Sequence, residues 1–521
     1  MMPQQEADIC LILEGTYPYV TGGVSSWVHD LIHSQPGLTF DIVAIIPLGS
    51  RTESRYTLPP NVRGVTDIVL QQVPSGDSPG RWIPERWLPG RSRGFAGALE
   101  RFFGAVEGPL ERLQRGGGLA ELAEILGAMA PLRGRLGSLS LLDSEQALAL
   151  EARLYQRTMP QASFLQHFWG WRALLGGLYS MLLPELPRAR AYHTICTGYA
   201  GVLAARAHLE TGRPCLLTEH GIYMNERRVE IAMANWLHDA GAGRLTLENA
   251  IGNVRDLWIG MFSGYARACY EASARIITLY EGNQPLQRAD GADPARMTVI
   301  PNGIHLADVP AVKPREERRP TIALIGRVVP IKDIKTFIRA CEQLREVVPA
   351  LRAWILGPTD EDPEYDAQCR AMVRYLELED TVQFMGRVKL NDYLPEIDVL
   401  VLTSISEAQP LVILEAGAWG IPTVATNVGS CEEMILGSAR EQPALGPGGI
   451  VTPLADPAAT ASAIERLLTD RAFHTRCGRT IRARLGRYYN KATLDAAYSR
   501  LYRETIDLPD APARPARGKV A

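Results

Sequence analysis

Two series of short apolar runs constrain the fold more than any other feature of this sequence. In the first series, residues 9–13, 41–46, 192–196 and 215–218 have the continuous apolar character of buried strands. The second series follows Pro320, with similar runs at residues 321–325, 353–356, 382–384, 399–402 and 423–425. Helical stretches lie between most of these runs, and alternating strands and helices predict a parallel sheet with right-handed crossovers. We therefore expect an α/β protein with two Rossmann-like domains.

The length of the chain also requires more than one core, because a domain averages about 150 residues and this chain has 521. Residues 308–320 hold three prolines with a charge run among them, which is typical of a linker. We predict an N-terminal domain at residues 1–312 and a C-terminal domain at residues 313–485. Ligands bind beyond the carboxyl ends of parallel strands, so we expect the substrate site in the cleft where the two domains face each other.

The remaining segments have a different composition. Residues 81–171 are rich in Leu, Ala, Arg and Glu at helical spacing, and we predict a helical insertion in the first domain at about residues 75–190. Its arginines form either a solvated helix face, which is the commoner case, or a docking surface. Residues 457–485 are predicted to be helical. A further helix is expected at residues 492–505, within a C-terminal segment (486–507) that crosses back to the first domain. The tail, residues 508–521, is expected to be disordered.

Composition excludes several classes of protein. The net charge of −3 argues against a nucleic-acid partner, because phosphate backbones select strongly basic surfaces. The eight cysteines are far apart and form neither a CxxC motif nor a Cys/His cluster, so we expect reduced thiols and no metal site. The N-terminus lacks the pattern of a signal peptide. The uncharged apolar run at residues 173–183 is far shorter than the ~20 residues that span a bilayer. We expect a cytoplasmic protein.

Glu407 and Glu415 flank a predicted helix start. Glu407 lies in the loop after the strand at residues 399–402, and Pro410 suits the first position of the next helix because it lacks an N–H. Free N–H groups just after Pro410 would form an anion site. Two carboxylates beside such amides suit a polyhydroxyl ligand that carries a diphosphate. The spacing alone would equally fit a helix-start charge and a surface glutamate.

Arg327 and Lys332 bracket the loop that follows the first strand of the second domain. Two cations at a strand's carboxyl end can hold a diphosphate and stabilise its charge as it leaves. An ordinary solvated loop would explain the same residues equally well. Arg327 and Lys332 therefore indicate a diphosphate site only in combination with the other motifs.

The first domain contributes two weaker motifs. His220 follows the strand at residues 215–218 and precedes a glycine, which favours a contact with the donor sugar over a purely structural role. Gly22 and Gly23 lie in the first turn of the chain. They indicate either a tight turn or a close approach of the backbone to phosphate or acceptor.

As an ordered set, these motifs resemble glycosyltransferase family four, which is retaining and has the GT-B fold. The resemblance covers about four-fifths of the chain and is carried by residues 21–24, 220–221, 300–304, 326–332, 386–388 and 407–425. Within the family, residues 14–19, 22–27 and 218–227 are similar to the cytosolic glycosyltransferases of Pel-type bacterial exopolysaccharide synthesis. Met224 and Asn225 depart from this pattern, where a Thr-Arg pair is expected.

The resemblance implies roles for the donor site. Arg327 and Lys332 would bind the diphosphate of a UDP-sugar, and Glu415 would hold the ribose hydroxyls. Glu407 would contact the donor sugar with help from backbone amides. These amides belong to Gln409, Leu411 and Val412.

Further implied roles concern the nucleobase and the acceptor. The base would lie near Arg387 and Val388, His220 would lie near C6 of the sugar, and Gly22 and Gly23 would form an acceptor or phosphate loop. The family needs no metal, and we regard residues 360–362 as a solvated turn. The acceptor would be a growing polysaccharide, with docking to inner-membrane Pel synthase components. The expected mechanism is front-face transfer with retention, and double displacement with Glu407 as nucleophile is the less favoured alternative.

Two other classes share the fold and the diphosphate site. One is a nucleotide-sugar epimerase, which would isomerise its donor without any acceptor. The other is a scaffold that binds a nucleotide-sugar and docks on a membrane synthase. The presence of Arg327, Lys332, Glu407 and Glu415 argues against a decayed scaffold. The sequence leaves open whether the sugar is N-acetylgalactosamine, N-acetylglucosamine or glucose.

Overall fold

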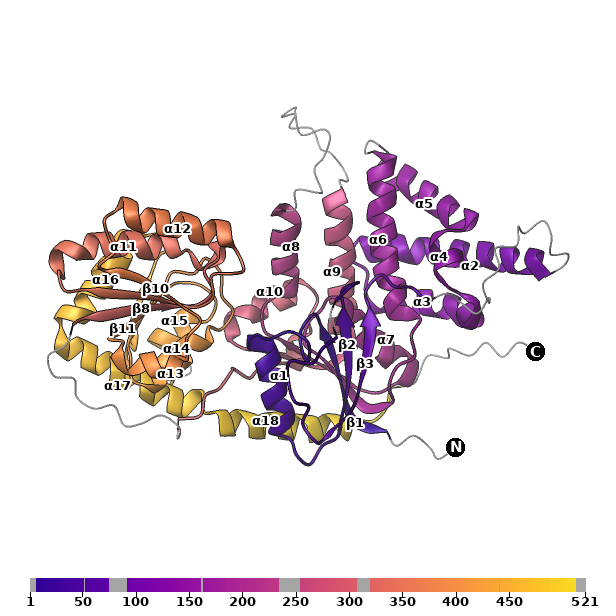
Figure 1. Cartoon of the computed structure of the whole chain (residues 1–521). Helices are drawn as coiled ribbons and strands as arrows, with labels where there is room; N and C mark the ends of the chain where they lie inside the picture. The colour runs from indigo at the N-terminus through magenta and orange to yellow at the C-terminus, as the bar shows by residue number, and fades with distance from the viewer. Residues whose placement is uncertain are drawn as a thin grey trace. The chain divides into compact units, whose positions relative to one another are not determined.

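The computed structural model describes residues 6–50, 52–74, 91–160, 163–233, 254–306, 319–439 and 441–511. The chain divides into two compact units (Figure 1). Unit 1 comprises Met1–Thr278, Gln284–Val299 and Tyr498–Ala521, and unit 2 comprises Leu279–Asn283 and Ile300–Ala497. The predicted boundary at residue 312 lies outside the described residues, as do residues 75–90 of the predicted insertion and nearly all of the predicted tail.

Unit 1 contains a parallel sheet in the order β3-β2-β1-β4-β5-β6-β7. Its strands are β1 (Ala7–Glu14), β2 (Phe40–Ile46), β3 (Val62–Val69), β4 (Ala189–Thr194), β5 (Cys215–Glu219), β6 (Ser273–Thr278) and β7 (Met297–Val299). The four strands predicted from sequence are confirmed. The three missed strands have a weaker signal: β3 and β6 mix polar with apolar residues, and β7 has three residues.

Within the part of the chain that the structure describes, five helices of unit 1 connect the strands of its sheet outside the insertion. They are α1 (Gly23–His33), α7 (Tyr199–Thr211), α8 (Tyr223–Met233), α9 (Val254–Ala272) and α10 (Gln284–Ala289), with a 3-10 turn at Pro294–Arg296. α7 ends at Gly212, whose φ of 74° is the left-handed conformation that commonly terminates a helix.

The helical insertion lies between β3 and β4. It contains α2 (Arg91–Gln114), α3 (Leu119–Met129), a 3-10 turn (Ala130–Arg135), α4 (Ser138–Leu142), α5 (Glu145–Thr158) and α6 (Phe164–Leu182). Phe103 of α2 and Trp171 of α6 belong to the same buried cluster as Cys10 of β1. The insertion therefore extends the core of unit 1 and does not form a separate domain.

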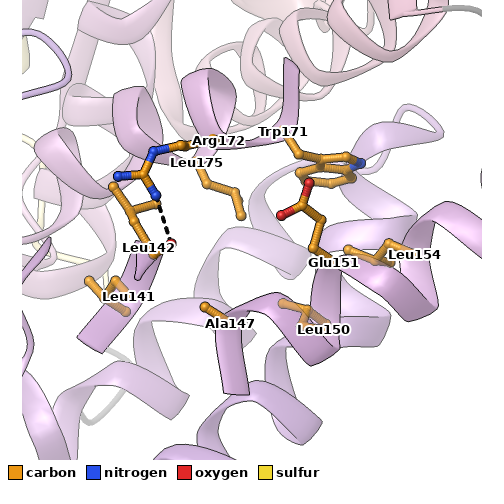
Figure 2. A pocket seen from close by; sticks show the side chains of 9 residues that line it. All are labelled: Leu141, Leu142, Ala147, Leu150, Glu151, Leu154, Trp171, Arg172 and Leu175. Atoms are coloured by element: carbon orange, nitrogen blue, oxygen red, sulfur yellow. Dashed lines mark hydrogen bonds between the residues drawn. The ribbon is translucent and has the colours of Figure 1, made fainter. Parts of the chain in front are cut away.

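A small cavity of about 20 Å³ lies inside the insertion (Figure 2). Leucine side chains line most of it, Glu151 points into it, and Arg172 donates a hydrogen bond to the backbone oxygen of Leu142 (2.7 Å). A volume of this size matches about one water molecule, so the cavity is too small for a sugar or a nucleotide.

Unit 2 contains a second parallel sheet in the order β10-β9-β8-β11-β12-β13. Its strands are β8 (Thr321–Ile325), β9 (Arg352–Leu356), β10 (Val382–Gly386), β11 (Val399–Leu402), β12 (Thr423–Thr426) and β13 (Gly449–Thr452). Both faces are covered, since Ile322 and Leu324 enter one buried cluster and Ala323 and Ile325 enter another. The sequence predicted every strand of this sheet except β13.

The helices of unit 2 alternate with these strands. They are α11 (Ile334–Val347), α12 (Pro363–Tyr375), α13 (Leu390–Tyr393), α14 (Leu411–Ala418), α15 (Cys431–Leu436), α16 (Pro457–Thr469) and α17 (Arg471–Tyr488), with 3-10 turns at Glu281–Asn283, Pro330–Lys332 and Leu394–Glu396. The helical stretch predicted at residues 457–485 is two helices, separated at Asp470, whose side chain caps α17.

The last helix, α18 (Lys491–Ile506), contributes residues to both units. Its second half is anchored in unit 1 by buried hydrogen bonds. The Tyr502 hydroxyl bonds to His193 Nδ1 (2.7 Å), and Thr218 Oγ1 bonds to both His193 Nε2 (2.9 Å) and the Tyr498 hydroxyl (3.2 Å). Burial lowers the pKa of His193 to about 3, so this histidine stays neutral.

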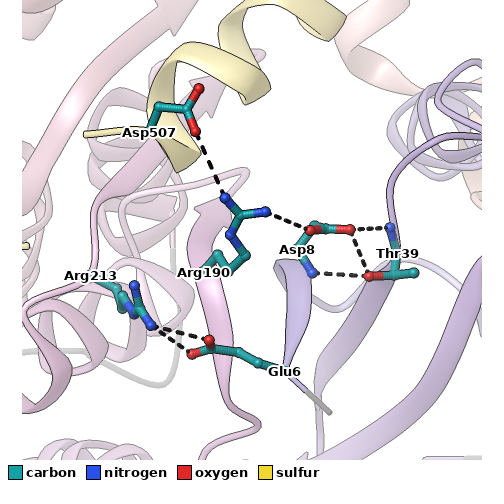
Figure 3. Close-up of polar contacts among 6 residues, drawn as sticks. All are labelled: Glu6, Asp8, Thr39, Arg190, Arg213 and Asp507. Carbon is teal, nitrogen blue, oxygen red and sulfur yellow. Dashed lines mark hydrogen bonds and ion pairs between the residues drawn. The ribbon is translucent and has the colours of Figure 1, made fainter. Parts of the chain in front are cut away.

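Surface polar contacts tie the end of α18 to the amino edge of the same sheet (Figure 3). Arg190 of β4 pairs with Asp8 of β1 at 3.2 Å and with Asp507 at 3.8 Å. Asp8 also accepts hydrogen bonds from the N–H and the hydroxyl of Thr39. Because these groups are partly exposed, each ion pair contributes at most about 1 kcal/mol.

Candidate functional site

The candidate site in unit 2 lies where the chain order of the sheet reverses. β8 has β9 on one side and β11 on the other, so the loops that follow β8 and β11 leave the sheet side by side. Ligands of open parallel sheets bind at such a switch point, beyond the carboxyl ends of the strands. The loop after β8 carries Lys332 and the loop after β11 carries Glu407.

Lys332 and Glu407 form a direct ion pair. Lys332 Nζ donates to Glu407 Oε1 at 2.5 Å, and the Ser404 hydroxyl donates to the same oxygen at 2.6 Å. The two charged side chains are 18% and 13% exposed. Because this pair is partly removed from water, its charges act more strongly on a bound ligand than surface charges would.

Hydrogen bonds between the two loops fix this arrangement. The Ile405 N–H donates to the Ile331 carbonyl (2.8 Å), and the Thr403 hydroxyl donates to the carbonyls of Lys332 (3.0 Å) and Asp333 (2.9 Å). Sequence reasoning missed the roles of Thr403 and Ser404. A hydroxyl pair directly after a buried strand was their only signal in the sequence.

α14 begins one residue later than the sequence suggested. Pro410 is the N-cap, with φ −72° and ψ 112°, and the first helical residue is Leu411. The backbone N–H groups of Leu411 and Val412 donate no hydrogen bond to any residue in the described part of the chain. They therefore remain available to an anion at this helix start.

Gln409 and Glu415 differ in their surroundings. The Gln409 side chain is nearly buried, and its Oε1 accepts a hydrogen bond from the N–H of Asn302 at 2.6 Å. Glu415 lies on α14, and burial raises its pKa. The amide of Gln409 thus orders the loop before α14, while Glu415 is a carboxylate whose ionisation depends on what binds beside it.

The other predicted donor residues of unit 2 lie in neighbouring loops of the same sheet edge. Arg327 follows β8 and pairs with Glu361 at 2.5 Å, and both side chains are about half exposed. Arg387 and Val388 directly follow β10, with Arg387 exposed and Val388 partly buried. Glu361 lies in the exposed bend at residues 360–361, as expected for a solvated turn, and its carboxylate also pairs with the guanidinium of Arg327.

The predicted residues of unit 1 also lie at the carboxyl edge of their sheet. Gly22 is the N-cap of α1, Gly23 is its first residue, and His220 follows β5. Trp27 of α1 lies edge-to-face against His220, with ring centroids 4.5 Å apart. His220 Nε2 is buried and has no hydrogen-bond partner among the described residues. Burial lowers the pKa of His220 to about 4, so near neutral pH it can exchange hydrogen bonds but carries no charge.

Sequence reasoning missed Glu14 in unit 1, at the switch point between β1 and β4. Its Oε2 accepts the N–H of Ala200 at the start of α7 (3.1 Å), and its Oε1 accepts the Tyr223 hydroxyl (3.1 Å). Arg227 in turn donates to the Tyr223 hydroxyl (2.7 Å). The signal was a carboxylate at the very end of the first strand. The start of α7 is thus occupied by a side chain of the protein itself.

Glu219 is a second acidic residue that the sequence did not single out. It is 1% exposed and accepts hydrogen bonds from the Tyr270 hydroxyl (2.7 Å), Gln287 Nε2 (2.9 Å) and the Tyr223 N–H (3.2 Å). Burial raises the pKa of Glu219 to about 7. Its contacts make it a support for the segment that carries His220.

Two further features bear on the kind of protein. No helix in the described ranges is both long and apolar enough to cross a bilayer. Within the same residues, His, Cys, Asp and Glu side chains do not gather in threes at a distance that would hold a metal ion.

Known proteins resemble both halves of the chain. Residues 7–295 match a family model described as a domain of unknown function, DUF3492, and residues 319–470 match one described as glycosyl transferases group 1. The D-inositol 3-phosphate glycosyltransferase of Kineococcus radiotolerans is 29% identical over 233 residues, covering 42% of this chain and 53% of that protein. The enzyme of the same description from Salinispora arenicola is 27% identical over 329 residues, covering 57% and 68%. The chain thus spans about half the length of the first of these relatives.

Solved structures share the fold. Sucrose-phosphate synthase from Thermosynechococcus elongatus has a TM-score of 0.54 at 16% identity, covering 95% of this chain and 98% of that one. Anabaena Alr3699/HepE in complex with UDP has a TM-score of 0.54 at 14% identity, covering 95% and 99%. These likenesses confirm the expected fold of two Rossmann-like domains. The second unit matches the glycosyl transferases group 1 model, the whole chain has the fold of the GT-B structures above, and through residues 7–295 the chain belongs to the DUF3492 family.

Proposed function

We propose that this protein is a retaining glycosyltransferase that transfers a sugar from a UDP-sugar to a growing exopolysaccharide. The observation that carries the proposal is the Lys332–Glu407 pair at the switch point of the unit 2 sheet, beside the free N–H groups at the start of α14. A cation, a carboxylate and helix-start amides together suit a ligand that is a diphosphate at one end and a polyol at the other.

The donor diphosphate would be bound by Lys332, Arg327 and the N–H groups of Leu411 and Val412. Arg327 is exposed enough to exchange Glu361 for a phosphate. The proposed roles in nucleotide recognition are those of Glu415 for the ribose hydroxyls and of the backbone near Arg387 and Val388 for the base.

Chemistry at the sugar follows from these contacts. The bond from the anomeric carbon to the β-phosphate oxygen breaks, the acceptor oxygen bonds to the same face, and the acceptor proton passes to the departing phosphate. The protein positions both reactants and stabilises the diphosphate charge with Lys332 and Arg327, a role for which we propose no metal. Glu407 would hold hydroxyls of the sugar and neutral His220 would contact the C6 side. Gly22 and Gly23 would let the backbone approach the acceptor.

The polymer and the cellular setting belong to the same proposal. Residues 14–19, 22–27 and 218–227 resemble PelF, which supports a cytoplasmic role in Pel-type polysaccharide synthesis with docking to inner-membrane synthase components. Solved structures of Alr3699/HepE contain UDP, or UDP and glucose, which supports a uridine nucleotide as the donor.

Thermal-shift measurements with a panel of nucleotide-sugars test the donor class. A ligand that binds only the native state raises the melting temperature. We expect UDP and at least one UDP-sugar to raise it, with ADP- and GDP-sugars inactive. A shift with another nucleotide alone would overturn the assignment of uridine. Conversion of a UDP-sugar to its isomer without an acceptor would indicate an epimerase.

A further inference from the structure

The carboxylate of Glu407 is held in place by its surroundings. Ser404, which is 1% exposed, donates to Glu407 Oε1, and the Ser404 carbonyl accepts the Thr426 hydroxyl at 2.6 Å. Ala408 directly follows Glu407 in the chain, and its carbonyl accepts a hydrogen bond from the N–H of Ser430 at 2.8 Å. Both the backbone and the carboxylate of Glu407 are therefore fixed by the loops after β11 and β12.

The side chain of Lys332 is held differently. Its backbone is fixed by Thr403, but the ammonium group donates its one hydrogen bond within the described residues to Glu407. Four flexible methylenes connect these two ends, and they lie over Gly326, where a Cβ atom would be 3.5 Å from Lys332 Cε. Within this ion pair, Lys332 is thus the partner that can move.

In the ion pair, the ammonium group of Lys332 and the carboxylate of Glu407 already satisfy each other's charge. A diphosphate that binds Lys332 must either share the ammonium group with Glu407 or break the ion pair. In both cases the carboxylate of Glu407 repels the negative charge of the phosphates. Transfer frees a phosphate oxygen, and once the proton taken from the acceptor passes on to water, UDP carries more negative charge than a UDP-sugar. Glu407 therefore competes for Lys332 with the diphosphate of the product UDP as well as with that of the UDP-sugar.

We propose that Glu407 competes with the diphosphate for Lys332 and thereby speeds the release of UDP after transfer. This inference rests on the proposed function and adds a second role to Glu407, beyond its contact with the sugar. When UDP leaves, the ammonium group returns to the fixed carboxylate.

Calorimetric binding of UDP to the full-length protein and to Glu407→Gln tests this role. Glutamine keeps the shape and the Ser404 hydrogen bond but removes the charge. We expect the variant to bind UDP at least about threefold tighter, because the repulsion between the Glu407 carboxylate and the phosphates is lost at a site partly shielded from water. Stopped-flow displacement should show the gain as a slower dissociation of UDP.

Glu396→Gln is the matched control. Glu396 pairs with Arg352 in the same unit, but these residues precede β11 and begin β9, at the amino edge of the sheet. The control should bind UDP as the wild type does, and equal tightening in both variants would reduce the effect to net charge and overturn the inference. UDP affinity that is unchanged or weaker in Glu407→Gln would overturn it while leaving the proposed function intact. A wild type that binds no uridine nucleotide would overturn both.

Discussion

Gly429 lies so close to the backbone of Glu407 that a Cβ atom on it would be 2.1 Å from the Glu407 carbonyl oxygen. Its φ of 54° is in the left-handed region, which glycine adopts without strain. The loop after β12 therefore supports the loop that carries the candidate sugar-binding carboxylate. This contact joins two loops that the sequence separates by more than twenty residues.

We predict that Gly429→Ala folds but loses at least about tenfold in transfer rate, because displacing Glu407 by a fraction of an ångström disturbs a positioned group. The rate with saturating donor and the melting temperature are the two measurements. Gly446→Ala is the control, since Gly446 also has positive φ (90°) but no atom lies within 4 Å of its Cβ position. Equal rates in the two alanine variants would contradict a role of this contact in positioning Glu407.

Replacing Lys332 with alanine should lower kcat by about 10²–10³-fold, the cost of removing one group that stabilises a developing negative charge. Lys335→Ala is the matched control, because Lys335 lies on α11 and donates to Gln368 on the surface. The control should retain wild-type kcat. If Lys332→Ala kept more than half of the wild-type kcat, the diphosphate role would be wrong.

Uridine binding should weaken as the pH falls through the raised pKa of Glu415. Burial is the cause of that raised pKa, and the ionised carboxylate is the form that accepts hydrogen bonds from ribose hydroxyls. Uridine is the suitable probe because it lacks a titrating phosphate, and its affinity can be followed by saturation-transfer NMR. Glu415→Gln should bind uridine weakly at every pH. A wild-type affinity that is flat with pH would argue against the contact.

The stability of unit 1 should depend on pH through two buried groups, His193 and Glu219, whose effects on the free energy of unfolding have opposite directions. The pKa of His193 is lowered to about 3, so between that value and about 6.5 the unfolded chain binds more protons and stability falls as the pH falls. The pKa of Glu219 is raised to about 7, so from about 4.5 upward the folded chain binds more protons and stability falls as the pH rises. Each contributes on the order of 1 kcal/mol per pH unit within its window.

Urea unfolding of His193→Gln and Glu219→Gln from pH 4.5 to pH 7.5 measures these contributions. Relative to the wild type, the His193 variant should become less stable as the pH rises, and the Glu219 variant should become more stable. If the plot of stability against pH for either variant ran parallel to that of the wild type, the substituted group would have an ordinary pKa in the folded state.

The sequence predicted most of the sheets because buried parallel strands are short continuous apolar runs, as in residues 321–325 and 399–402. It missed β3, whose polar and glycine residues interrupt the pattern, and β13, which has four residues between glycine- and proline-rich segments. Helix positions were reliable where periodicity was strong. The last helix of the insertion, α6, ends at Leu182, within the predicted range of about residues 75–190.

The candidate site was only partly predictable for a different reason. Local motifs indicated Lys332 and Glu407, but their ion pair joins positions 75 residues apart and depends on β8 and β11 being neighbours. The supporting groups Thr403, Ser404 and Gly429 act through tertiary contacts that have no local pattern. Glu14 and Glu219 were missed because a single acidic residue at a strand end is common on protein surfaces.

Product analysis measures sugar transfer from a UDP-sugar at the Lys332–Glu407 site. The wild type and Lys332→Ala would be incubated with isotope-labelled UDP-N-acetylgalactosamine, UDP-N-acetylglucosamine or UDP-glucose and a series of oligosaccharide acceptors. We predict that the wild type releases UDP and extends an acceptor through a linkage with the donor's anomeric configuration, and that Lys332→Ala forms almost none of this product. An inverted linkage, or equal product from both proteins, would contradict the account.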